Sequence, residues 1–228
     1  MTDLPLDVRG LSRSFGRVEA VRAVDLEVRP GELVGFVGRN GAGKSTTIQV
    51  VAGQLLPSGG AVRVSGVDPA ADPLGARARL GYVPEEPRLF EYLSAREMVA
   101  FVADLRGGGD VEAALEVAAL GADADRPIAE YSQGMRRRAA IACALVAAPP
   151  LLVFDEALNG LDPPSAGRVV AALRAATRRG AGVLLSTHVL DTLERVADRV
   201  VLIESGRTVG SLDASRMGEV RRFLGADG

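Results

Sequence analysis

The sequence is poor in several residue types: its 228 residues include one cysteine, one histidine, one lysine and no tryptophan. A single cysteine, Cys143, excludes an intramolecular disulfide and fits a reducing compartment. One cysteine and one histidine are also too few for a structural zinc site of the ordinary kind. Because Cys143 lies in an alanine-rich apolar stretch, we interpret it as a small core residue and not as a reactive thiol.

The sequence also lacks a strong charge of one sign and a long apolar segment. The net charge is −2, with both signs spread along the chain, which argues against a nucleic-acid partner because such binders usually carry a basic face. The N-terminal MTDLPLDVRG has no basic segment followed by an apolar one, so we expect no secretion signal. The longest uncharged run, residues 139–154, is too short for a membrane span and contains Pro149 and Pro150. We therefore expect a soluble chain whose membrane role would depend on a partner.

What the sequence does contain is the pattern of an α/β protein. The length and the 47% hydrophobic content predict one α/β domain, alone or with a subdomain. Short apolar or alternating runs predict strands at residues 6–10, 23–28, 33–38 and 61–66. Residues 94–148 have helical apolar spacing, with segments at 94–105 and 110–120. Strands and helices then alternate at 151–154, 164–179, 182–186, 188–197, 199–203, 206–213 and 214–224. This alternation predicts a parallel sheet covered on both faces, with the helical stretch as an insertion.

A phosphate-binding loop is the strongest local signal. Residues 38–45, GRNGAGKS, match G-x-x-x-x-G-K-[ST] in full, after a predicted strand and before a predicted helix. In such a loop, glycines let the backbone approach phosphates, and successive N–H groups form an anion nest at a helix N-terminus. A chance glycine-rich turn is disfavoured because strand, loop and helix are all present. The predicted nucleotide-binding residues are Gly38, Asn40, Gly41, Ala42, Gly43, Lys44, Ser45 and Thr46.

Lys44 is the only lysine, whereas the other 26 of the 27 basic residues are arginines. A compact ammonium can sit between β- and γ-phosphates inside a tight loop, where the planar guanidinium fork is too wide. Lys44 is therefore predicted to be catalytic as well as nucleotide-binding. Ser45 is predicted to ligate Mg²⁺, and Thr46 to support an adjacent phosphate.

Two carboxylates follow the apolar strand at residues 151–154. Asp155 is predicted to hold Mg²⁺ through its water shell. Glu156 is predicted to polarise the attacking water as general base, an effect typically worth ~10²–10⁴ in rate. Two solvated carboxylates at a strand end are the alternative. The phosphate loop and the strand before His188 favour the catalytic interpretation.

Residues 131–156, YSQGMRRRAAIACALVAAPPLLVFDE, resemble the ATP-binding subunits of ABC transporters, which carry a signature of the LSGGQ type before the acidic strand. The segment YSQGM departs from LSGGQ at three places but keeps Ser132 and Gly134. Ser132 can cap a helix running to about Ala147, and its hydroxyl and the Gly134 N–H could then meet a γ-phosphate. An ordinary helix cap is the alternative. We interpret the three arginines at 136–138 as a solvated face.

The resemblance extends to other site residues. It implies that Phe15 stacks on adenine, with a hairpin core residue as the alternative, and that Asp162 belongs to a nucleotide-contacting loop, NGLD. Within DEALNGLD, Ala157-Leu158 replace the usual Pro-Thr. Glu85 stands where the family usually has Gln; its carboxylate could approach Mg²⁺ or water but adds negative charge near phosphates. His188 resembles the switch histidine that contacts the γ-phosphate.

The family implies a P-loop NTPase fold, with a RecA-like core, an antiparallel β-subdomain and an inserted helical subdomain. We assign one ATP-binding domain to residues 1–228, with core and β-subdomain at 1–85 and 149–228 and the helical subdomain at 86–148. The resemblance further implies ATP and Mg²⁺, bound head-to-tail between this chain and a second copy or a related subunit. Each site would combine Lys44 and Glu156 of one chain with Ser132 of the other.

The stretch GYVPEEPRLFEYLSAREMVAF, followed by YSQGM, resembles ABC-2 type exporters of drugs and natural products. This predicts that ATP hydrolysis powers export through a separate transmembrane permease, with the chain on the cytoplasmic face of the membrane. An importer subunit is an alternative, and so is a soluble non-transport ABC ATPase. The latter is less favoured because the sequence lacks a second nucleotide domain, a long coiled coil and zinc-binding cysteines. Leu89, Phe90, Tyr92 and Leu93 are predicted to line a groove for a partner helix, or else the subdomain core.

Overall fold

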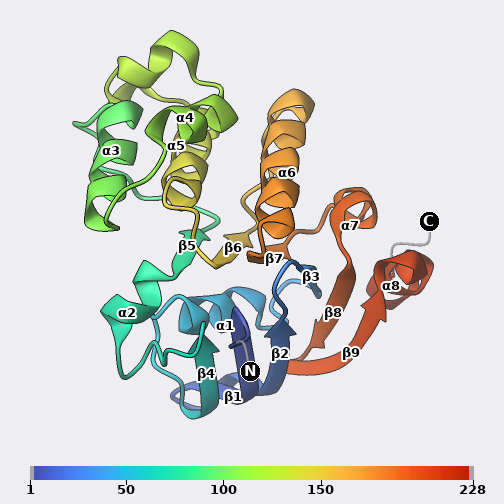
Figure 1. The fold of residues 1–228 in the computed structure, drawn as a ribbon. Coiled ribbons are helices and arrows are strands. Elements are labelled where there is room, and N and C mark those ends of the chain that lie inside the picture. Colours follow the sequence, from blue (N-terminus) through green and yellow to red (C-terminus); the bar gives the residue numbers. More distant parts are fainter. Residues whose placement is uncertain (1–2, 226–228) are drawn as a thin grey trace.

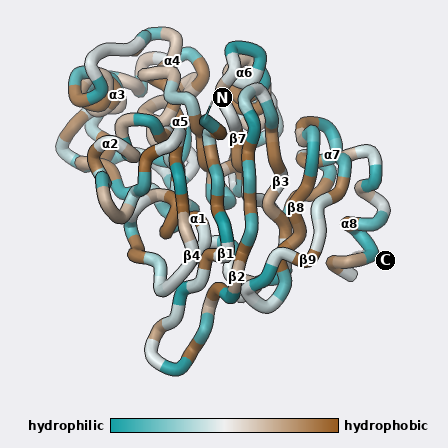
Figure 2. The backbone as a smooth tube through the Cα atoms, turned by 60° about the horizontal axis from the view of Figure 1, so that its bottom comes forward, coloured by the Kyte–Doolittle hydropathy of each residue, from teal (hydrophilic) through white to brown (hydrophobic). Residues whose placement is uncertain are grey.

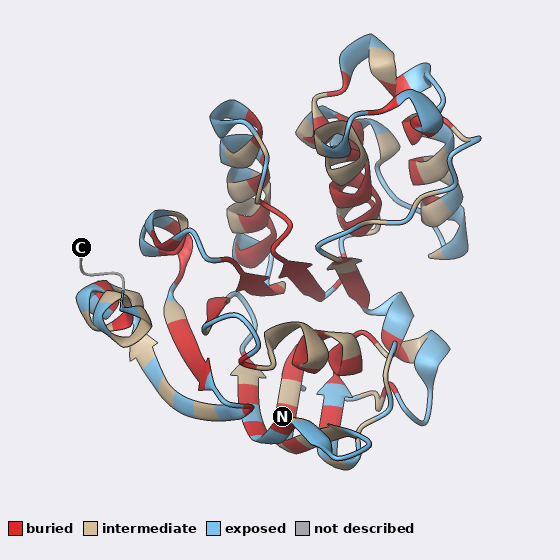
Figure 3. Ribbon diagram, turned by 180° about the vertical axis from the view of Figure 1, so that it is seen from behind, coloured by how far each residue is buried: buried red, intermediate tan, exposed pale blue. Residues whose placement is uncertain are grey.

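A six-stranded sheet of order β5-β6-β7-β3-β8-β9 forms the centre of the computed structural model, which describes residues 3–225 (Figure 1). The strands are β3 (Leu33–Val37), β5 (Leu80–Val83), β6 (Leu151–Asp155), β7 (Gly182–Ser186), β8 (Arg199–Glu204) and β9 (Arg207–Asp213). Pairing is parallel from β5 to β8, and only β9 is antiparallel to its neighbour. Strands β3, β6 and β7 are buried at every residue (Figure 3), as expected for parallel strands covered on both faces.

A second, antiparallel sheet covers one face of the central sheet. Its order is β2-β1-β4, with β1 (Leu6–Phe15), β2 (Val18–Val28) and β4 (Gly59–Val64). Helix α1 (Lys44–Val51) lies between the two sheets (Figure 1), where Ile48 and Val51 join a core with Phe36. The hairpin of β1 and β2 is longer than the predicted strands, because pairing continues to Phe15 and Val18.

Three helices cover the opposite face: α6 (Pro163–Arg178), α7 (Leu190–Val196) and α8 (Met217–Leu224), the last after a short 3-10 turn at Ala214–Arg216. Their apolar residues share one core with β3, β6, β7 and β8. The tube in Figure 2 shows the same concentration of hydrophobic residues along β3 and β8. Helix α7 begins at Leu190, later than the predicted 188–197. The segment from Thr187 to Val189 is a turn, because the Thr187 hydroxyl accepts a hydrogen bond from the Val189 N–H at 3.1 Å.

A helical lobe follows β5 and is inserted before β6 (Figure 1). It contains α3 (Ala95–Leu105), α4 (Val111–Ala118) and α5 (Gln133–Leu145), with 3-10 turns at Gly121–Asp125 and Ile128–Glu130. Ser94 and Glu97 form a reciprocal capping box at the start of α3. The lobe has a core of its own, which includes the buried Cys143. Burial raises the pKa of the Cys143 thiol to about 12, in agreement with its interpretation as an inert core residue.

The sequence patterns did not predict two short elements, α2 (Pro73–Ala78) and β5. Both are too short for a periodic signal, and β5 is recognisable only from its pairing with β6. The two ends of the predicted domain, residues 1–2 and 226–228, lie outside the described residues.

Candidate functional site

The loop at residues 38–45 connects β3 to α1, as predicted. Gly43 is the N-cap of α1 with φ 102° and provides no side-chain cap, so the first N–H groups of the helix remain for a ligand. A Cβ on Gly38 would lie 2.3 Å from the Ile203 carbonyl oxygen, so only glycine fits there. The Lys44 ammonium donates to the Gly38 carbonyl at 2.8 Å, so the lysine curls back over the loop. The N-terminus of α1 thus offers backbone donors, and the Lys44 ammonium lies against the loop beside it.

Asp155, at the end of β6, is the buried carboxylate of the site. The residue is 3% exposed, and its Oδ1 atom is buried without a hydrogen-bond partner among the described residues. Burial raises its pKa, while the hydroxyls of Ser45 and Ser186 act in the opposite direction. The negative charges of Glu156 and Glu85 raise the pKa further. The fold therefore brings Ser45 and Asp155 together, with Glu85 close enough to act on Asp155 electrostatically.

The side chains of Glu156, His188 and Asn159 lie within hydrogen-bond distance of one another in a triangle. Glu156 has a left-handed backbone with φ 51°, which places its carboxylate against the loop after β7. Its Oε2 atom accepts from the Asn159 amide at 2.7 Å and from the His188 backbone N–H at 3.2 Å, and it lies 3.1 Å from His188 Nδ1. The same Nδ1 lies 3.2 Å from the Asn159 amide. Nδ1 makes one of these two hydrogen bonds at a time: with a proton it donates to Glu156, and without one it accepts from the Asn159 amide.

The exposure of the two titratable members differs. The His188 side chain is 71% exposed, against 11% for that of Glu156. His188 is thus available to a ligand, whereas Glu156 is buried and held by two donors, the Asn159 amide and the His188 backbone N–H. A carboxylate fixed in this way can accept a proton from an adjacent water, which is the geometry of a general base.

The signature residues lie in the helical lobe at the N-terminus of α5. The Ser132 hydroxyl accepts from the Met135 N–H at 3.3 Å and caps the helix, as predicted. Ser132 is exposed, and a Cβ on Gly134 would lie 3.9 Å from the Gly160 carbonyl oxygen. Gly134 therefore lies beside the NGLD loop of the same chain, in a different layer of the molecule from α1 (Figure 1).

The prediction that residues 136–138 form a solvated face was wrong. All three arginines are half-buried, and each donates hydrogen bonds to other segments. Arg136 bonds to Glu91 and to the carbonyls of Tyr131 and Ala129. Arg138 donates to the carbonyls of Ala118 and Ala119 at the end of α4. Arg137 donates to the carbonyls of Asn159 and Glu85, which lie outside the helical lobe. The charge run gave no sign of these partners because most of them are backbone carbonyls and the others are distant in sequence.

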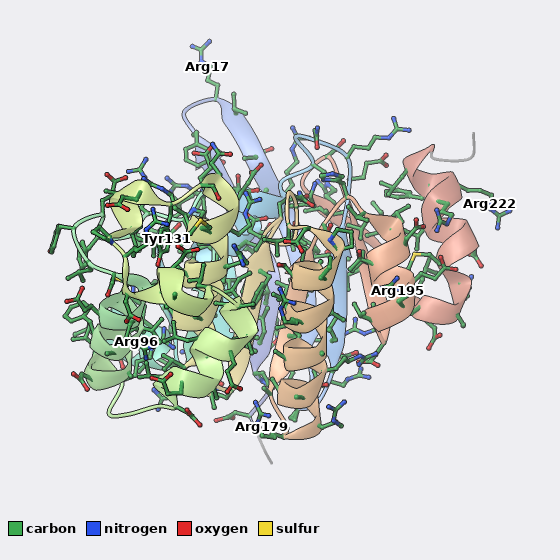
Figure 4. All side chains as sticks on the ribbon, turned by 90° about the horizontal axis from the view of Figure 1, so that it is seen from above. Arg17, Arg96, Tyr131, Arg179, Arg195 and Arg222 are labelled. Atoms are coloured by element: carbon green, nitrogen blue, oxygen red, sulfur yellow. The ribbon has the colours of Figure 1, made fainter. Side chains whose placement is uncertain are left out.

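The remaining predicted residues lie at separate places. Phe15 ends β1 and is 45% exposed, with the Arg13 guanidinium 4.6 Å above its ring, so it is not a core residue. Figure 4 shows the adjacent turn, marked by Arg17, projecting from the molecule. Asp162 is the N-cap of α6, and its hydrogen bonds with the Ser165 side chain and backbone lower its pKa. Glu85 is exposed, and the Arg137 guanidinium donates to its backbone carbonyl at 2.8 Å.

Comparison with known proteins identifies the family. The ABC transporter model matches residues 21–159, more than half of the 228 residues. The chain belongs to the ABC transporter family. This ABC protein is 36% identical to the daunorubicin/doxorubicin resistance ATP-binding protein DrrA of Streptomyces peucetius, over 97% of this chain and 68% of that protein. It is 31% identical to the bacitracin transport ATP-binding protein BcrA of Enterococcus faecalis, over 93% of this chain and 70% of that protein.

Another relative, a putative ABC transporter ATP-binding protein of Streptomyces avermitilis, is 40% identical, and the chain spans 37% of its length. Among solved structures, the ABC protein resembles an ATP-binding subunit of an ABC transporter, with a TM-score of 0.87 and 33% identity over 98% of this chain and 94% of the other. It also resembles a bacterial Atm1-family ABC exporter with ATP bound, with a TM-score of 0.84 and 26% identity over the whole of this chain and 41% of the other. The predicted fold class, the ABC family and the ATPase class are thereby confirmed. Within residues 3–225, none of the helices combines the length and apolar character that crossing a bilayer requires.

Two further residues of the site were not among the predicted ones, Asn159 and Arg137. Asn159 lies in the NGLD segment that the resemblance singled out, three residues after Glu156. An amide at that spacing beside a buried carboxylate is a signal that the sequence does contain. Arg137 carries no such signal, since only the fold brings it to the core loops.

Proposed function

We propose that this ABC ATPase hydrolyses ATP through Lys44, Glu156 and His188 and powers export through a separate membrane partner. The observation that carries the catalytic part is the triangle of Glu156, Asn159 and His188 beside the loop at 38–45. Glu156 accepts the proton of the attacking water, and His188, the exposed member, contacts the γ-phosphate. Lys44 and the backbone N–H groups of the loop hold the β- and γ-phosphates, with Thr46 beside them.

Mg²⁺ fits the same place. Oδ1 of Asp155 is buried without a partner among the described residues, and its carboxylate lies beside the Ser45 hydroxyl. Mg²⁺ usually takes one or two protein oxygens and completes its shell with phosphates and water. We assign Ser45 and Asp155 as its ligands, with Glu85 as a further carboxylate nearby. When bound, the ion supplies positive charge against the phosphate oxygens and the buried carboxylate.

We further propose that two chains bind two ATP molecules head-to-tail. Ser132 is exposed and Gly134 half-buried at the N-terminus of α5, away from the loop of their own chain. Helix α5 has 13 residues, and its N-terminal dipole favours a phosphate. A second copy, or a related subunit, would place Ser132 and Gly134 against the γ-phosphate held by the first chain. Asp162 would then lie near the interface, and Phe15 would stack on adenine through the ring face not covered by Arg13.

Mixing two inactive variants tests this arrangement. Lys44→Ala and Ser132→Ala should each abolish turnover as homodimers, because every site contains one damaged half. A mixed dimer has one site with both substitutions and one intact site, so mixing should restore hydrolysis. Activity that stays absent after mixing, with both variants folded, would count against the shared site.

Glu156→Gln with ATP should elute as a dimer from a sizing column, because it retains the binding shell and weakens the base.

Export is supported by the relatives and by one surface. DrrA is named for daunorubicin and doxorubicin resistance, and others are named Nod factor export ATP-binding proteins. On this chain, Phe90, Tyr92 and Phe101 are exposed on the helical lobe, and the Phe90 and Tyr92 rings stack at 5.8 Å. We propose that these aromatics hold a helix of the transmembrane permease and that the chain is peripheral on the cytoplasmic side of the membrane. Leu89 and Leu93 are more buried, and Leu89 contacts two cores.

Two assignments belong to this proposal. Residues 86–148 act as one helical subdomain that carries both the signature and the partner surface, while 1–85 and 149–228 carry the nucleotide.

Co-purification with the permease tests the partner surface. Tyr92→Ala should lose the permease while keeping ATP binding, and Leu74→Ala, an exposed apolar residue on α2, is the matched control.

A further inference from the structure

Three consecutive arginines in the first turns of α5 contact different parts of the molecule. Arg136 and Arg138 donate to groups within the helical lobe, as described above. Arg137 alone crosses to the core, where its Nη1 donates to the Asn159 carbonyl and its Nη2 to the Glu85 carbonyl at 2.8 Å. We propose that Arg137 is a positioning residue for ATP hydrolysis, which holds Asn159 and thereby Glu156 in place from the signature helix. The inference rests on the proposed function of the site.

The chemistry of the guanidinium suits this role. It is planar and has two terminal nitrogens, so one side chain can donate to two carbonyls on separate segments. A lysine ammonium is a point donor and cannot hold two loops that diverge. The two segments here are the one after β5, which carries Glu85, and the one after β6, which carries Asn159.

The path from Arg137 to the reacting groups is short. Arg137 bonds to the main chain of Asn159, and the Asn159 side chain donates to Glu156 Oε2 at 2.7 Å. The same amide lies 3.2 Å from His188 Nδ1. A shift of Arg137 would therefore move the amide that orients the general base.

Stability alone does not account for this contact. Both acceptors are neutral carbonyls, and Arg137 Nε is buried without a partner among the described residues. Burying part of a cation without a carboxylate costs free energy, and only the hydrogen bonds offset it. The loop also approaches α5 closely, because Gly160 has φ 72° and a Cβ there would lie 3.2 Å from Arg137 Nη1. A side chain at residue 160 would therefore strain the backbone and press against the Arg137 guanidinium.

A consequence follows from the position of Ser132 on the same helix. In the proposed dimer, Ser132 serves the ATP held by the second chain, while Asn159 and Glu156 serve the ATP of their own chain. Arg137 connects the two along one rigid helix. Contact of Ser132 with the second chain's ATP would then change the position of Glu156 in its own chain. We therefore expect Arg137 to affect the rate of turnover more than the affinity for ATP.

The test compares Arg137→Lys with Arg138→Lys in the full chain. Arg138 Nη1 donates to two adjacent carbonyls of one turn, which an ammonium can still reach. We expect Arg137→Lys to lower kcat by ~10-fold or more, the loss of about one hydrogen bond in the transition state, with ATP affinity within about twofold of wild type. Arg138→Lys should keep its turnover. Arg137→Gln, which keeps a donor without the charge, serves if Arg137→Lys does not fold.

A double-mutant cycle with Asn159→Ala identifies the route. If Arg137 acts by placing the Asn159 amide, Arg137→Lys should lower kcat much less in the Asn159→Ala background than in wild type. Equal turnover in Arg137→Lys and Arg138→Lys, or fully additive losses in the cycle, would overturn the inference. A wild-type chain that does not hydrolyse ATP at all would instead reject the proposed function.

Discussion

Replacing Asn159 by alanine tests the catalytic triangle most directly. The substitution removes the amide that donates to Glu156 Oε2 at 2.7 Å and that lies 3.2 Å from His188 Nδ1. It keeps the main chain, including the carbonyl that accepts from Arg137. The perturbation therefore acts on the orientation of the general base and the switch histidine, and it also removes the acceptor of the Thr187 hydroxyl at 3.4 Å.

The expected loss can be worked out from the partners of Glu156. Glu156 is only 9% exposed, so water cannot fully replace the lost donor. A hydrogen bond to a charged group is worth about 1.5–3 kcal/mol, which corresponds to roughly 10–150-fold in rate if it is lost in the transition state. The His188 backbone N–H still holds the same oxygen at 3.2 Å. We therefore expect the lower part of this range, about 10–30-fold in kcat.

The assay is steady-state ATP hydrolysis together with ATP affinity and a thermal melt. Affinity should be nearly unchanged, because the loop at 38–45 is untouched. Asn159→Asp is the matched comparison: it has the same size but places a second carboxylate against Glu156, so its loss should be larger. A folded Asn159→Ala protein with turnover within about twofold of wild type would refute the role assigned to the triangle.

Three further substitutions test individual groups of the site. Lys44→Arg should keep the melting temperature but reduce hydrolysis by ~10²-fold or more, because the planar guanidinium cannot take the position of the ammonium within the loop; near-normal turnover would contradict this. Glu85→Gln should leave ATPase rates intact or raise them, and a collapse would make the carboxylate essential. Asp155→Asn should raise the melting temperature measured without nucleotide at pH 7. It should also abolish the increase in melting temperature that Mg²⁺ gives. The sign follows from burial, which raises the pKa of Asp155, so native stability falls as pH rises from about 4 through that raised value. A melting temperature of Asp155→Asn below that of wild type would show that the negative charge of Asp155 is already compensated in the folded protein.

Much of the site could be predicted from the sequence because its parts are local. The loop that ends in Lys44 and Ser45 lies between a strand and a helix within one short segment, so its conformation depends on neighbouring residues. Asp155 and Glu156 follow an apolar run that can only be a buried strand, and Ser132 precedes a helical pattern that it can cap. In a parallel sheet the carboxyl ends of the strands meet at one edge, so the loop after β3 and the carboxylates after β6 were bound to converge, whereas Ser132 lies in the helical lobe.

Only the tertiary structure showed which contacts connect these segments to one another. Arg136, Arg137 and Arg138 form one charge run in the sequence, and nothing in that run distinguishes a solvated face from three separate anchors. Apart from the Glu91 carboxylate, their acceptors are backbone carbonyls, which every residue has and which therefore leave no sequence signal. The turn that takes His188 out of the following helix likewise depends on Glu156, which accepts its backbone N–H from another strand end. Contacts of this kind arise only when distant segments are packed together, because the partner is selected by position in space and not by residue type.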